Sequence, residues 1–414
     1  MTDAATTEWR VDRLGRRGDG ILSGPDGRSA LAGRVLPGEI ITGTPDDTGR
    51  VMDPRIVTPS AHRITPPCPH YAQCGSCSLM HATDGFVAGW KAGMVRAALS
   101  AHGIEAEIAG VATSPPASRR RAVLSGRRTK KGARLGFHGR ASDQIVDLGE
   151  CRVLRPAIVA TLPVLRDIVA VGASRGAELA LTVTETGSGL DVAVQGGKPL
   201  DPSTSDRLLR LADEGDLARL DWDGTAFTRR VPVLRMGRSA VTPPPGAFLQ
   251  ATAEGEAALL SVVRKALSGA RRIVDLFAGC GTFTLPLATQ AEIHAVEGLS
   301  APLDALDTAW RASTGLRRVT TETRDLAARP LLPDELAEYD AAIIDPPRSG
   351  ASAQAEQLAA STLERVAWVS CDPVSFARDA ATMAGAGWRM GPVYVVDQFR
   401  WSPHVETVTG FTRD

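Results

Sequence analysis

The sequence predicts an α/β protein whose C-terminal part is a doubly wound parallel sheet, preceded by a small β-barrel and a mixed α+β region. Three observations lead to this fold class. Apolar runs alternate with helical patterns from Ala251 onward, glycine and proline turns interrupt the first 60 or so residues, and proline-rich stretches separate the parts. We place the domain boundaries at 7–63, 64–245 and 246–414.

Composition supports a folded protein of ordinary surface charge. The chain has 414 residues, of which 43% are hydrophobic and 23% charged, and this length predicts two to three domains. Lys+Arg (47) and Asp+Glu (47) balance, so any affinity for nucleic acid must come from a local patch. One candidate is the segment from Arg119 to Arg140, which carries nine Lys or Arg and no Asp or Glu.

No stretch approaches 18 consecutive apolar residues, and the opening MTDAATTEWR lacks a basic segment followed by an apolar run. We therefore expect a cytoplasmic protein that does not enter a membrane. Six cysteines in such a protein favour metal or catalytic use over disulfides.

The N-terminal elements are indicated by short segments and the turns between them. Short alternating segments closed by glycine and proline are typical of a small β-barrel, although an irregular leader would show the same punctuation. Further along, we expect a helix over 86–99, strands near 122–124 and 135–137, and further strands within 178–197.

The C-terminal elements follow from stronger patterns. A helix through Leu267 precedes a strand over 273–276, and further strands end at Glu297, Ile344 and Ser370. Helices are expected from Phe283, from Ser300 and over 374–384. Ligands of such sheets bind at the carboxyl ends of the strands, and each candidate residue from this half follows a strand.

The segment Asp275 to Gly281 closes the first of these strands with a glycine turn, and Glu297 ends the next strand, where it can bind ribose hydroxyls. This combination favours a nucleoside ligand over a tight connection without one. Thr284 stands where a dinucleotide fold would have its third glycine, so a nicotinamide-dependent oxidoreductase is disfavoured.

The sequence Asp345-Pro346-Pro347-Arg348 holds a carboxylate at the end of another strand, because two prolines fix the backbone there. Enzymes that methylate exocyclic amines have an aromatic residue in the fourth position. Cytosine-5 methyltransferases have a Pro-Cys dipeptide. Arg348 argues against both chemistries.

Cys371 ends a further strand, just before a helix. Most cysteines are buried structural residues, but a nearby helix N-terminus stabilises a thiolate, so we interpret Cys371 as a nucleophile. Glu406 follows 35 residues later; a lone glutamate near a C-terminus is ordinarily a solvated charge.

A second constellation is formed by four cysteines, three closely spaced and one remote: Cys68, Cys74, Cys77 and Cys151. Four thiolates can hold a [4Fe–4S] cluster or a tetrahedral zinc ion. The three-plus-one spacing favours the cluster, and zinc with His70 or His81 as a ligand remains the alternative.

Taken together, these residues resemble the S-adenosylmethionine-dependent RNA uracil-5-methyltransferases, in particular the iron-sulfur members that modify 23S ribosomal RNA. The resemblance covers nearly the whole chain. The N-terminal part is similar to the family's TRAM domain, an RNA-binding barrel of OB type. The segments that follow the family's methyltransferase motifs are Phe248-Leu249-Gln250, Asp275 to Gly281, Asp345 to Arg348, Ser370 to Pro373 and Ala377-Arg378-Asp379.

The resemblance implies a class I methyltransferase fold, a [4Fe–4S] cluster on the four cysteines, Cys371 as nucleophile and Glu406 as base. It also implies a set of residues around S-adenosylmethionine or the target base: Gln250, Phe277, Thr282, Glu297, Asp325 and Asp345. The chain departs from the family at Asp372 and Thr282, where asparagine is usual, and in the run from Phe399 to His404.

The expected reaction is methylation of uracil C5 in RNA. A thiolate adds to C6, C5 then attacks the sulfonium methyl, and a carboxylate removes the C5 proton. We expect 23S rRNA as substrate, with tRNA as the alternative, and a monomer without an obligate protein partner. A non-catalytic iron-sulfur RNA-binding protein would leave Cys371 and Glu406 without a role.

Overall fold

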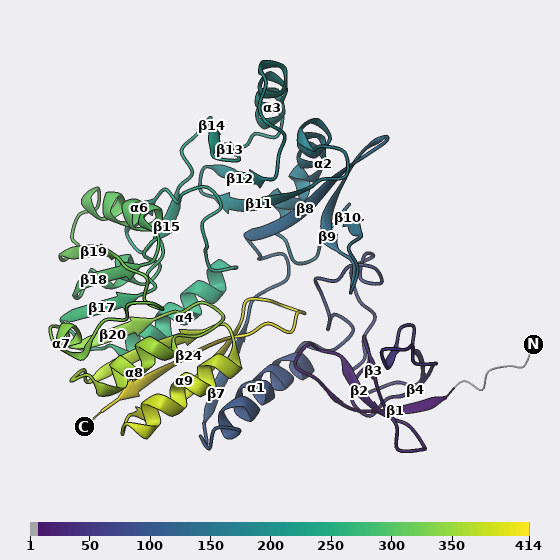
Figure 1. Cartoon of the computed structure of the whole chain (residues 1–414), viewed down its shortest axis with the longest axis horizontal. Coiled ribbons are helices and arrows are strands. Elements are labelled where there is room, and N and C mark those ends of the chain that lie inside the picture. The colour runs from purple at the N-terminus through teal and green to yellow at the C-terminus, as the bar shows by residue number, and fades with distance from the viewer. Residues whose placement is uncertain (1–6, 414) are drawn as a thin grey trace, which may run out of the picture.

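The computed structural model describes residues 7–413. Residues 1–6, part of the stretch inspected for a targeting signal, and residue 414 lie outside the described residues. Figure 1 shows three sheet-containing regions, with the N-terminal sheet and the central sheet on different sides of the C-terminal one. Within 7–413, no helix is both long enough and apolar enough to cross a membrane.

The N-terminal region is an open, half-barrel sheet rather than a closed barrel. Buried and exposed side chains alternate along its first strand, where Trp9 and Val11 point inward, and they pack on Leu22 and Ile41. The strand order is β5-β3-β2-β1-β4-β6, so β5 and β6 are edges that do not pair with each other. The strands are β1 (Glu8–Leu14), β2 (Gly20–Ser23), β3 (Ser29–Ala32), β4 (Ile40–Thr42), β5 (Arg50–Val51) and β6 (Arg55–Thr58).

The central region is a seven-stranded sheet in the order β10-β9-β8-β11-β12-β13-β14, antiparallel except for the pair β12 and β13. Its strands are β8 (Arg121–Thr129), β9 (Gly132–His138), β10 (Ile145–Asp147), β11 (Glu178–Thr186), β12 (Gly189–Gln195), β13 (Arg219–Trp222) and β14 (Thr225–Thr228). The sheet packs against α2 (Pro156–Gly172), and α3 (Pro202–Glu214) contacts α2. A small hairpin of β15 (Leu234–Met236) and β16 (Ser239–Val241) follows.

The C-terminal sheet has the order β19-β18-β17-β20-β21-β24-β23-β7, with β22 beside β24. The first five strands are parallel, and β24 runs antiparallel to β21. The bounds are β7 (Ile108–Thr113), β17 (Arg272–Leu276), β18 (Glu292–Glu297), β19 (Val319–Thr323), β20 (Ala341–Ile344), β21 (Arg365–Ser370), β22 (Arg389–Met390), β23 (Val393–Asp397) and β24 (Glu406–Thr412). The strand ends predicted at Glu297, Ile344 and Ser370 are confirmed.

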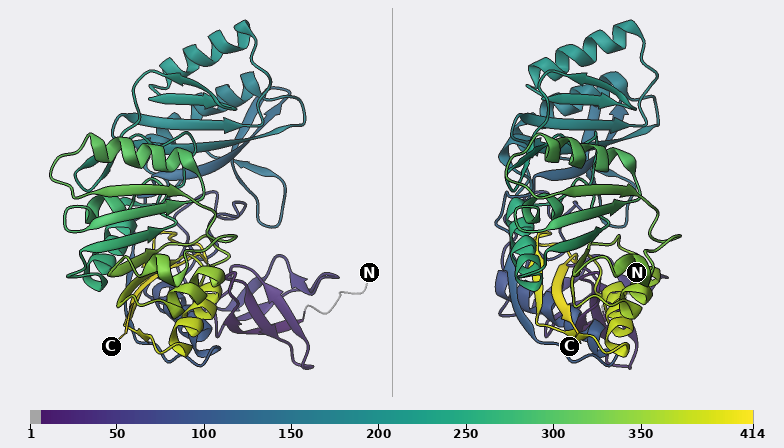
Figure 2. Two further views of the ribbon diagram at one scale, coloured as in Figure 1. Left: turned by 60° about the vertical axis from the view of Figure 1, so that its left-hand side comes forward. Right: turned by 90° about the vertical axis from the view of Figure 1, so that its left-hand side faces the viewer.

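Helices cover both faces of this sheet, because its central strands are apolar on both sides (Figures 1 and 2). One layer contains α4 (Ala253–Ala266) and α6 (Ser300–Arg311), and the other contains α1 (Asp84–Ser100), α8 (Ser352–Ala360) and α9 (Pro373–Gly385). Two helices are single turns, α5 (Thr284–Leu287) and α7 (Pro333–Leu336). The helix expected from Phe283 is only one turn long.

The predicted boundary between 64–245 and 246–414 does not hold for residues 84–113. Strand β7 pairs in parallel with β23, and α1 packs on α9, so this segment belongs to the C-terminal sheet. Sequence pattern could not indicate this, because a strand's partner is set by long-range packing. The remaining boundaries stay predictions.

Candidate active site

The predicted ligand-binding residues line the carboxyl edge of the parallel strands, which we call the catalytic edge. These residues are far apart in sequence but lie in one row, because the parallel strands that carry them end at the same edge of the sheet. From β19 toward β24, the row contains Asp325, Glu297, Phe277, Asp345, Cys371 and Glu406.

Cys371 and Glu406 lie at the same end of two antiparallel strands, β21 and β24. Ser370, the last residue of β21, pairs with Thr407 of β24. Cys371 directly follows Ser370 and Glu406 directly precedes Thr407, and residues at neighbouring positions of paired strands lie close together. Cys371 and Glu406 are 35 residues apart in sequence, and the pairing of β24 with β21 brings them near each other.

A hydrogen-bonded chain of side chains connects the two carboxyl groups of this edge. Gln250 Nε2 donates to Asp345 Oδ2 (3.2 Å), and Gln398 Nε2 donates to Gln250 Oε1 (2.6 Å). Gln398 also hydrogen-bonds the Glu406 carboxyl. Gln250, Gln398 and Glu406 are each at most 2% exposed, so the chain is shielded from water.

Burial makes these carboxyl groups weak acids. Desolvation raises the pKa of Asp345 to about 7. Burial, and then the nearby charge of Asp345, raises the pKa of Glu406 well above its usual range. Carboxyl groups with raised pKa values are better proton acceptors than free ones, which is the property that a general base requires.

The expectation that a helix N-terminus keeps Cys371 ionised is wrong for this structure. Burial, with Glu406 and Asp345 nearby, raises the pKa of the Cys371 thiol to about 12. The N-terminus of α9 is satisfied by Asp372, whose Oδ1 accepts from the backbone N–H groups of Val374 (3.0 Å) and Ser375 (3.1 Å). Those N–H groups are thus already bonded to a carboxylate.

The glycine turn after β17 faces Glu297. The Glu297 carboxylate accepts from the backbone N–H of Gly279 (3.0 Å) and of Gly298 (2.7 Å), which holds it beside the turn. Gly279 has a φ of +54°, and a Cβ there would stand in open space. Phe277 also has a positive φ of 64°, an uncommon and strained conformation for an aromatic residue.

A fully buried acid lies beneath this turn. Asp275 is 0% exposed, and burial raises its pKa to about 7. Its Oδ2 accepts from Thr284 Oγ1 (2.5 Å), whereas its Oδ1 finds no hydrogen-bond partner among the described residues. The open space, the oriented carboxylate and this orphaned oxygen fit a bound nucleoside. Asp325 is exposed, and Thr282 is half-buried in the turn.

A cleft of about 1020 Å³ opens at Cys371, between the N-terminal region and the C-terminal sheet. Its walls combine apolar side chains of α1, such as Trp90 and Met94, with arginines on the opposite side, and we call it the catalytic cleft. The charged side chains that line it are Arg13, Arg16, Arg17, Arg348 and Asp372. Arg16 Nη2 reaches Asp372 Oδ2 at 3.3 Å, so the half-barrel contacts the catalytic edge directly.

The four cysteines predicted as cluster ligands line one small cavity, which we call the cysteine cavity (about 30 Å³): Cys68, Cys74, Cys77 and Cys151. Burial raises the pKa of Cys74, Cys77 and Cys151, and the neighbouring thiols raise it further. Within 7–413, however, no group of three or more His, Cys, Asp or Glu side chains is arranged as a metal-ion site. The four sulfur atoms lie around one cavity, but their spacing is not that of a metal-ion site.

The zinc alternative is not favoured by the histidines. His81 is buried and hydrogen-bonded through Nδ1 to the Tyr71 hydroxyl (2.6 Å) and through Nε2 to the Val35 carbonyl (3.4 Å). His70 does line the cavity, but its Nε2 accepts from the Gly149 N–H (3.2 Å). Both ring nitrogens of His81 and Nε2 of His70 therefore already have hydrogen-bond partners.

The basic segment Arg119 to Arg140 does not form one RNA-facing surface. Arg120 pairs with Glu256, and Arg121 donates to the Ala247 carbonyl (3.0 Å), so both connect the central region to the chain around α4. Arg119 lines the cysteine cavity. The exposed cations of this segment are four residues of the β8–β9 hairpin: Arg128, Lys130, Lys131 and Arg134.

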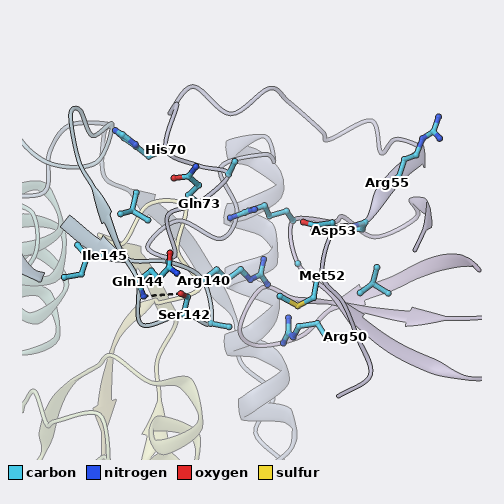
Figure 3. A pocket seen from close by; sticks show the side chains of 18 of the residues that line it. Arg50, Met52, Asp53, Arg55, His70, Gln73, Arg140, Ser142, Gln144 and Ile145 are labelled. Atoms are coloured by element: carbon cyan, nitrogen blue, oxygen red, sulfur yellow. Dashed lines mark hydrogen bonds between the residues drawn. The ribbon is translucent and has the colours of Figure 1, made fainter. Parts of the chain in front are cut away.

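A second groove, of about 980 Å³, lies between the half-barrel and the central region, and Figure 3 shows part of its lining. Arg50 from the half-barrel and Arg140 from the central region share one carboxylate, Asp19. The other positive side chains of this arginine groove are Arg34, Arg55, Arg63 and Arg134.

Sequence reasoning missed two residues that organise this edge, Gln398 and Lys91. The ammonium of Lys91 is fully buried and contacts Asp397 Oδ1 at 2.5 Å. Its partner lies 306 residues further along the chain, so no local pattern could have identified it. Gln398 carries no pattern of its own, and only its position between β23 and Glu406 indicates its role.

Comparisons with known proteins agree with this architecture. A family model described as tRNA (Uracil-5-)-methyltransferase matches residues 311–413. An uncharacterized RNA methyltransferase of Brucella suis is 40% identical over 414 residues, covering 100% of this chain and 99% of that protein. The 23S rRNA (uracil(1939)-C(5))-methyltransferase RlmD of Chromohalobacter salexigens is 33% identical, covering 100% and 90%.

Among solved structures, the tRNA (uracil-54, C5)-methyltransferase of Pyrococcus abyssi with S-adenosyl-L-homocysteine superposes with a TM-score of 0.75. The match covers 98% of this chain and 99% of that one at 19% identity, so it establishes the fold. Fold and site thus define a class I S-adenosylmethionine-dependent methyltransferase preceded by a β half-barrel. The chain belongs to the RNA uracil-5-methyltransferase family, and it is an S-adenosylmethionine-dependent RNA (uracil-5-)-methyltransferase.

Proposed function

We propose that Cys371 is the nucleophile and Glu406 the base of uracil C5 methylation. The observation that carries this proposal is the strand register that brings the two residues to the same end of β21 and β24, where Cys371 lines the catalytic cleft and the charge of Glu406 acts on its thiol. A thiol and a carboxyl from different strands then converge on one small volume. A flat pyrimidine that has left its base stack can enter such a volume.

The bonds balance through a covalent adduct. The Cys371 sulfur adds to uracil C6. The electron pair of the C5–C6 double bond then forms a new bond from C5 to the methyl carbon of S-adenosylmethionine. S-adenosylmethionine supplies that methyl group and departs as S-adenosylhomocysteine. Glu406 then removes the C5 proton, the C5–C6 double bond reforms, and the sulfur leaves C6 with its electron pair.

The raised pKa of Cys371 means that its proton must be transferred as the sulfur adds. Glu406 and Asp345 are the carboxyl groups whose charge acts on this thiol. We infer that Asp345 accepts the thiol proton, which leaves Glu406 free to remove the C5 proton. Because both are weak acids here, the reaction requires a pH high enough to ionise them.

The residues proposed to hold S-adenosylmethionine surround the glycine turn. Glu297 is positioned for the ribose hydroxyls, and Phe277 and Thr282 border the same turn. Gln250 and Asp345 reach the reacting end through their shared hydrogen bond. Asp325 follows β19 at the far end of the row, where an adenine ring would extend.

We propose 23S rRNA as the substrate, and the catalytic cleft, the β8–β9 hairpin and the arginine groove as its contact surfaces. Arginine pairs well with phosphate, and Trp90 offers a ring on which a base can stack. The 33% identity to a 23S rRNA enzyme supports this substrate. The description of the matching family model supports tRNA as the second candidate.

We further propose that the four cysteines hold a [4Fe–4S] cluster with a structural or RNA-docking role. Burial, and then neighbouring thiols, raise the pKa of Cys74, Cys77 and Cys151, and a cationic metal centre would stabilise these groups as thiolates. The present spacing means that binding would draw the thiols together. Iron and acid-labile sulfide measured after anaerobic purification test this, and stoichiometric zinc without iron would contradict it.

The deciding experiment incubates in vitro transcripts of 23S rRNA and of tRNA with labelled S-adenosylmethionine, followed by nucleoside digestion. We expect 5-methyluridine in the rRNA transcript. Cys371→Ala should lose at least about 1,000-fold in turnover. Glu406→Gln should form an enzyme–RNA adduct that survives denaturation. Normal turnover by either variant would overturn the residue assignment.

A further inference from the structure

A connecting segment carries the proposed base between two distant parts of the molecule. Residues 398–405, which we call the base loop, leave β23 at the catalytic edge, extend to the cysteine cavity and return to Glu406. Gln398 begins the loop at the edge. Arg400 and Ser402 line the cysteine cavity, and Pro403, His404 and Val405 line the catalytic cleft.

The far end of the base loop is fixed to the cysteine-containing segment. The Trp401 carbonyl accepts from the backbone N–H groups of both Ser78 (2.8 Å) and Leu79 (2.9 Å). The Trp401 ring is 5% exposed and packs with Tyr71 and Met80. Trp401 has a φ of +61°, a conformation that a non-glycine residue keeps only where its surroundings hold it.

The near ends of the base loop are held by one side chain, Lys91 of α1. Its ammonium donates to Asp397 Oδ1 (2.5 Å), to the His404 carbonyl (2.7 Å) and to the Phe399 carbonyl (3.3 Å). An ammonium has three donors, and here all three are used. Asp397 and Phe399 flank the start of the loop, and His404 lies two residues before Glu406.

The same helix contacts the nucleophile's side of the site. Helix α1 packs on α9, whose first turn directly follows Cys371. Lys91 therefore sits on an element that contacts both the base loop and the helix that follows Cys371. A side chain in this place can set the distance between the base and the nucleophile. The paired strands fix the positions of the two backbones, but they do not fix this distance between side chains.

Resting on the proposed roles of Cys371 and Glu406, we propose that Lys91 is a positioning residue for removal of the C5 proton. It holds both ends of the base loop so that Gln398 and Glu406 meet the methylated adduct. Cys371 itself lies outside this loop, directly after β21. Loss of Lys91 therefore slows the elimination step more than the formation of the adduct.

The test compares adduct formation and product release in single-turnover reactions on a 23S rRNA transcript, or on a tRNA transcript if only that RNA is methylated. Lys91→Met should form the adduct within threefold of the wild-type rate. It should release 5-methyluridine at least about 30-fold more slowly, so that the adduct accumulates. The exposed cation Arg96, on the same helix, provides the control variant Arg96→Met.

A second variant separates positioning from an uncompensated buried charge. In Lys91→Met/Asp397→Asn no charge is left without its partner, but the Phe399 and His404 carbonyls still lose their donor. Accumulated adduct in this variant supports the proposal, also if Lys91→Met alone fails to fold. Wild-type release by the double variant, or equal slowing of both steps, overturns it.

The wild-type and Glu406→Gln proteins run in parallel identify which inference fails. If Glu406→Gln traps no adduct, the proposed base is wrong and the role of Lys91 falls with it. If Glu406→Gln traps the adduct while the Lys91 variants do not, only the positioning role is overturned.

Discussion

The catalytic edge and the cysteine cavity both crowd acidic groups into buried space, but they stabilise them differently. At the edge, Gln250 and Gln398 bridge Asp345 and Glu406, so the site is built from its own hydrogen bonds. In the cysteine cavity, burial and then neighbouring thiols raise the pKa of Cys77 and Cys151, and Arg119 is a cation that opposes this rise. The first site is therefore organised by its own hydrogen bonds, whereas the second is proposed to be stabilised by a bound metal centre.

The largest difference between the two sites is expected when a thiol is removed from the cysteine cavity. Cys68→Ser should abolish the binding of about four iron atoms per chain, because the cluster needs all four ligands. Binding of S-adenosylmethionine at the edge should change less than twofold. Iron analysis and calorimetric titration measure the two effects.

Cys280→Ser is the matched control for that variant, since Cys280 is 3% exposed but lies in the glycine turn, away from the cysteine cavity. It should retain its iron. Loss of iron from this variant, or iron retained by Cys68→Ser, would contradict the assignment of the cluster.

The buried acids of the edge predict a pH-dependent stability. The pKa of Asp275 is near 7 in the folded protein and 3.8 as its ordinary value. Below about pH 4 the group is protonated in both states and costs nothing. As the pH rises to 7 the unfolded state ionises first, which destabilises the fold by up to about 4 kcal/mol. As the pH rises from 5 to 8, the free energy of unfolding should therefore fall less in Asp275→Asn than in the wild type.

Urea unfolding at both pH values measures this difference, and Asp304→Asn, which changes an exposed carboxyl on α6, serves as the control. Equal pH dependence in the wild type and Asp275→Asn would show that Asp275 is not the weak acid described.

Turnover should also rise with pH. Because the pKa of Glu406 is raised, the group is protonated at low pH and cannot accept the C5 proton. Below its pKa, release of 5-methyluridine should increase about tenfold per pH unit until the carboxyl is ionised. Single-turnover rates from pH 5.5 to 9 measure this, and a flat profile would exclude a carboxyl base with a raised pKa.

The smallest expected effect concerns the contact between the half-barrel and the edge. Arg16 is exposed and pairs with Asp372, so it can exchange this carboxylate for an RNA phosphate. Arg16→Ala should weaken RNA binding about threefold and reduce the slope of log K against log salt by about 1. Filter binding at several salt concentrations measures both; an unchanged slope would mean that Arg16 does not contact phosphate.

The sequence predicted the row of candidate residues because several of them lie at the end of an apolar strand that is marked by polar or turn residues. Glu297, Asp345 and Cys371 are such cases, and the parallel sheet brings them to one edge. Glu406 was found by resemblance alone, since its role depends on an antiparallel register that no local pattern encodes.

Other features depend on contacts across the whole chain, and the sequence could not indicate them. The strand β7 joins a sheet formed by residues far downstream, and Lys91 finds its partner in Asp397. The high pKa of Cys371 was also missed, because burial and neighbouring carboxyls outweigh the helix that follows it. Similarly, Arg120 and Arg121 are used for internal contacts rather than for RNA.

The pairing of β7 with β23 imposes an order on biosynthesis. Strand β7 emerges from the ribosome early, yet its neighbour β23 is among the last segments to be made. During nearly all of translation this strand therefore has an open edge that can associate with other chains. A truncation that removes only the final strands would leave that edge exposed permanently, so such fragments should aggregate rather than accumulate as a stable shorter protein.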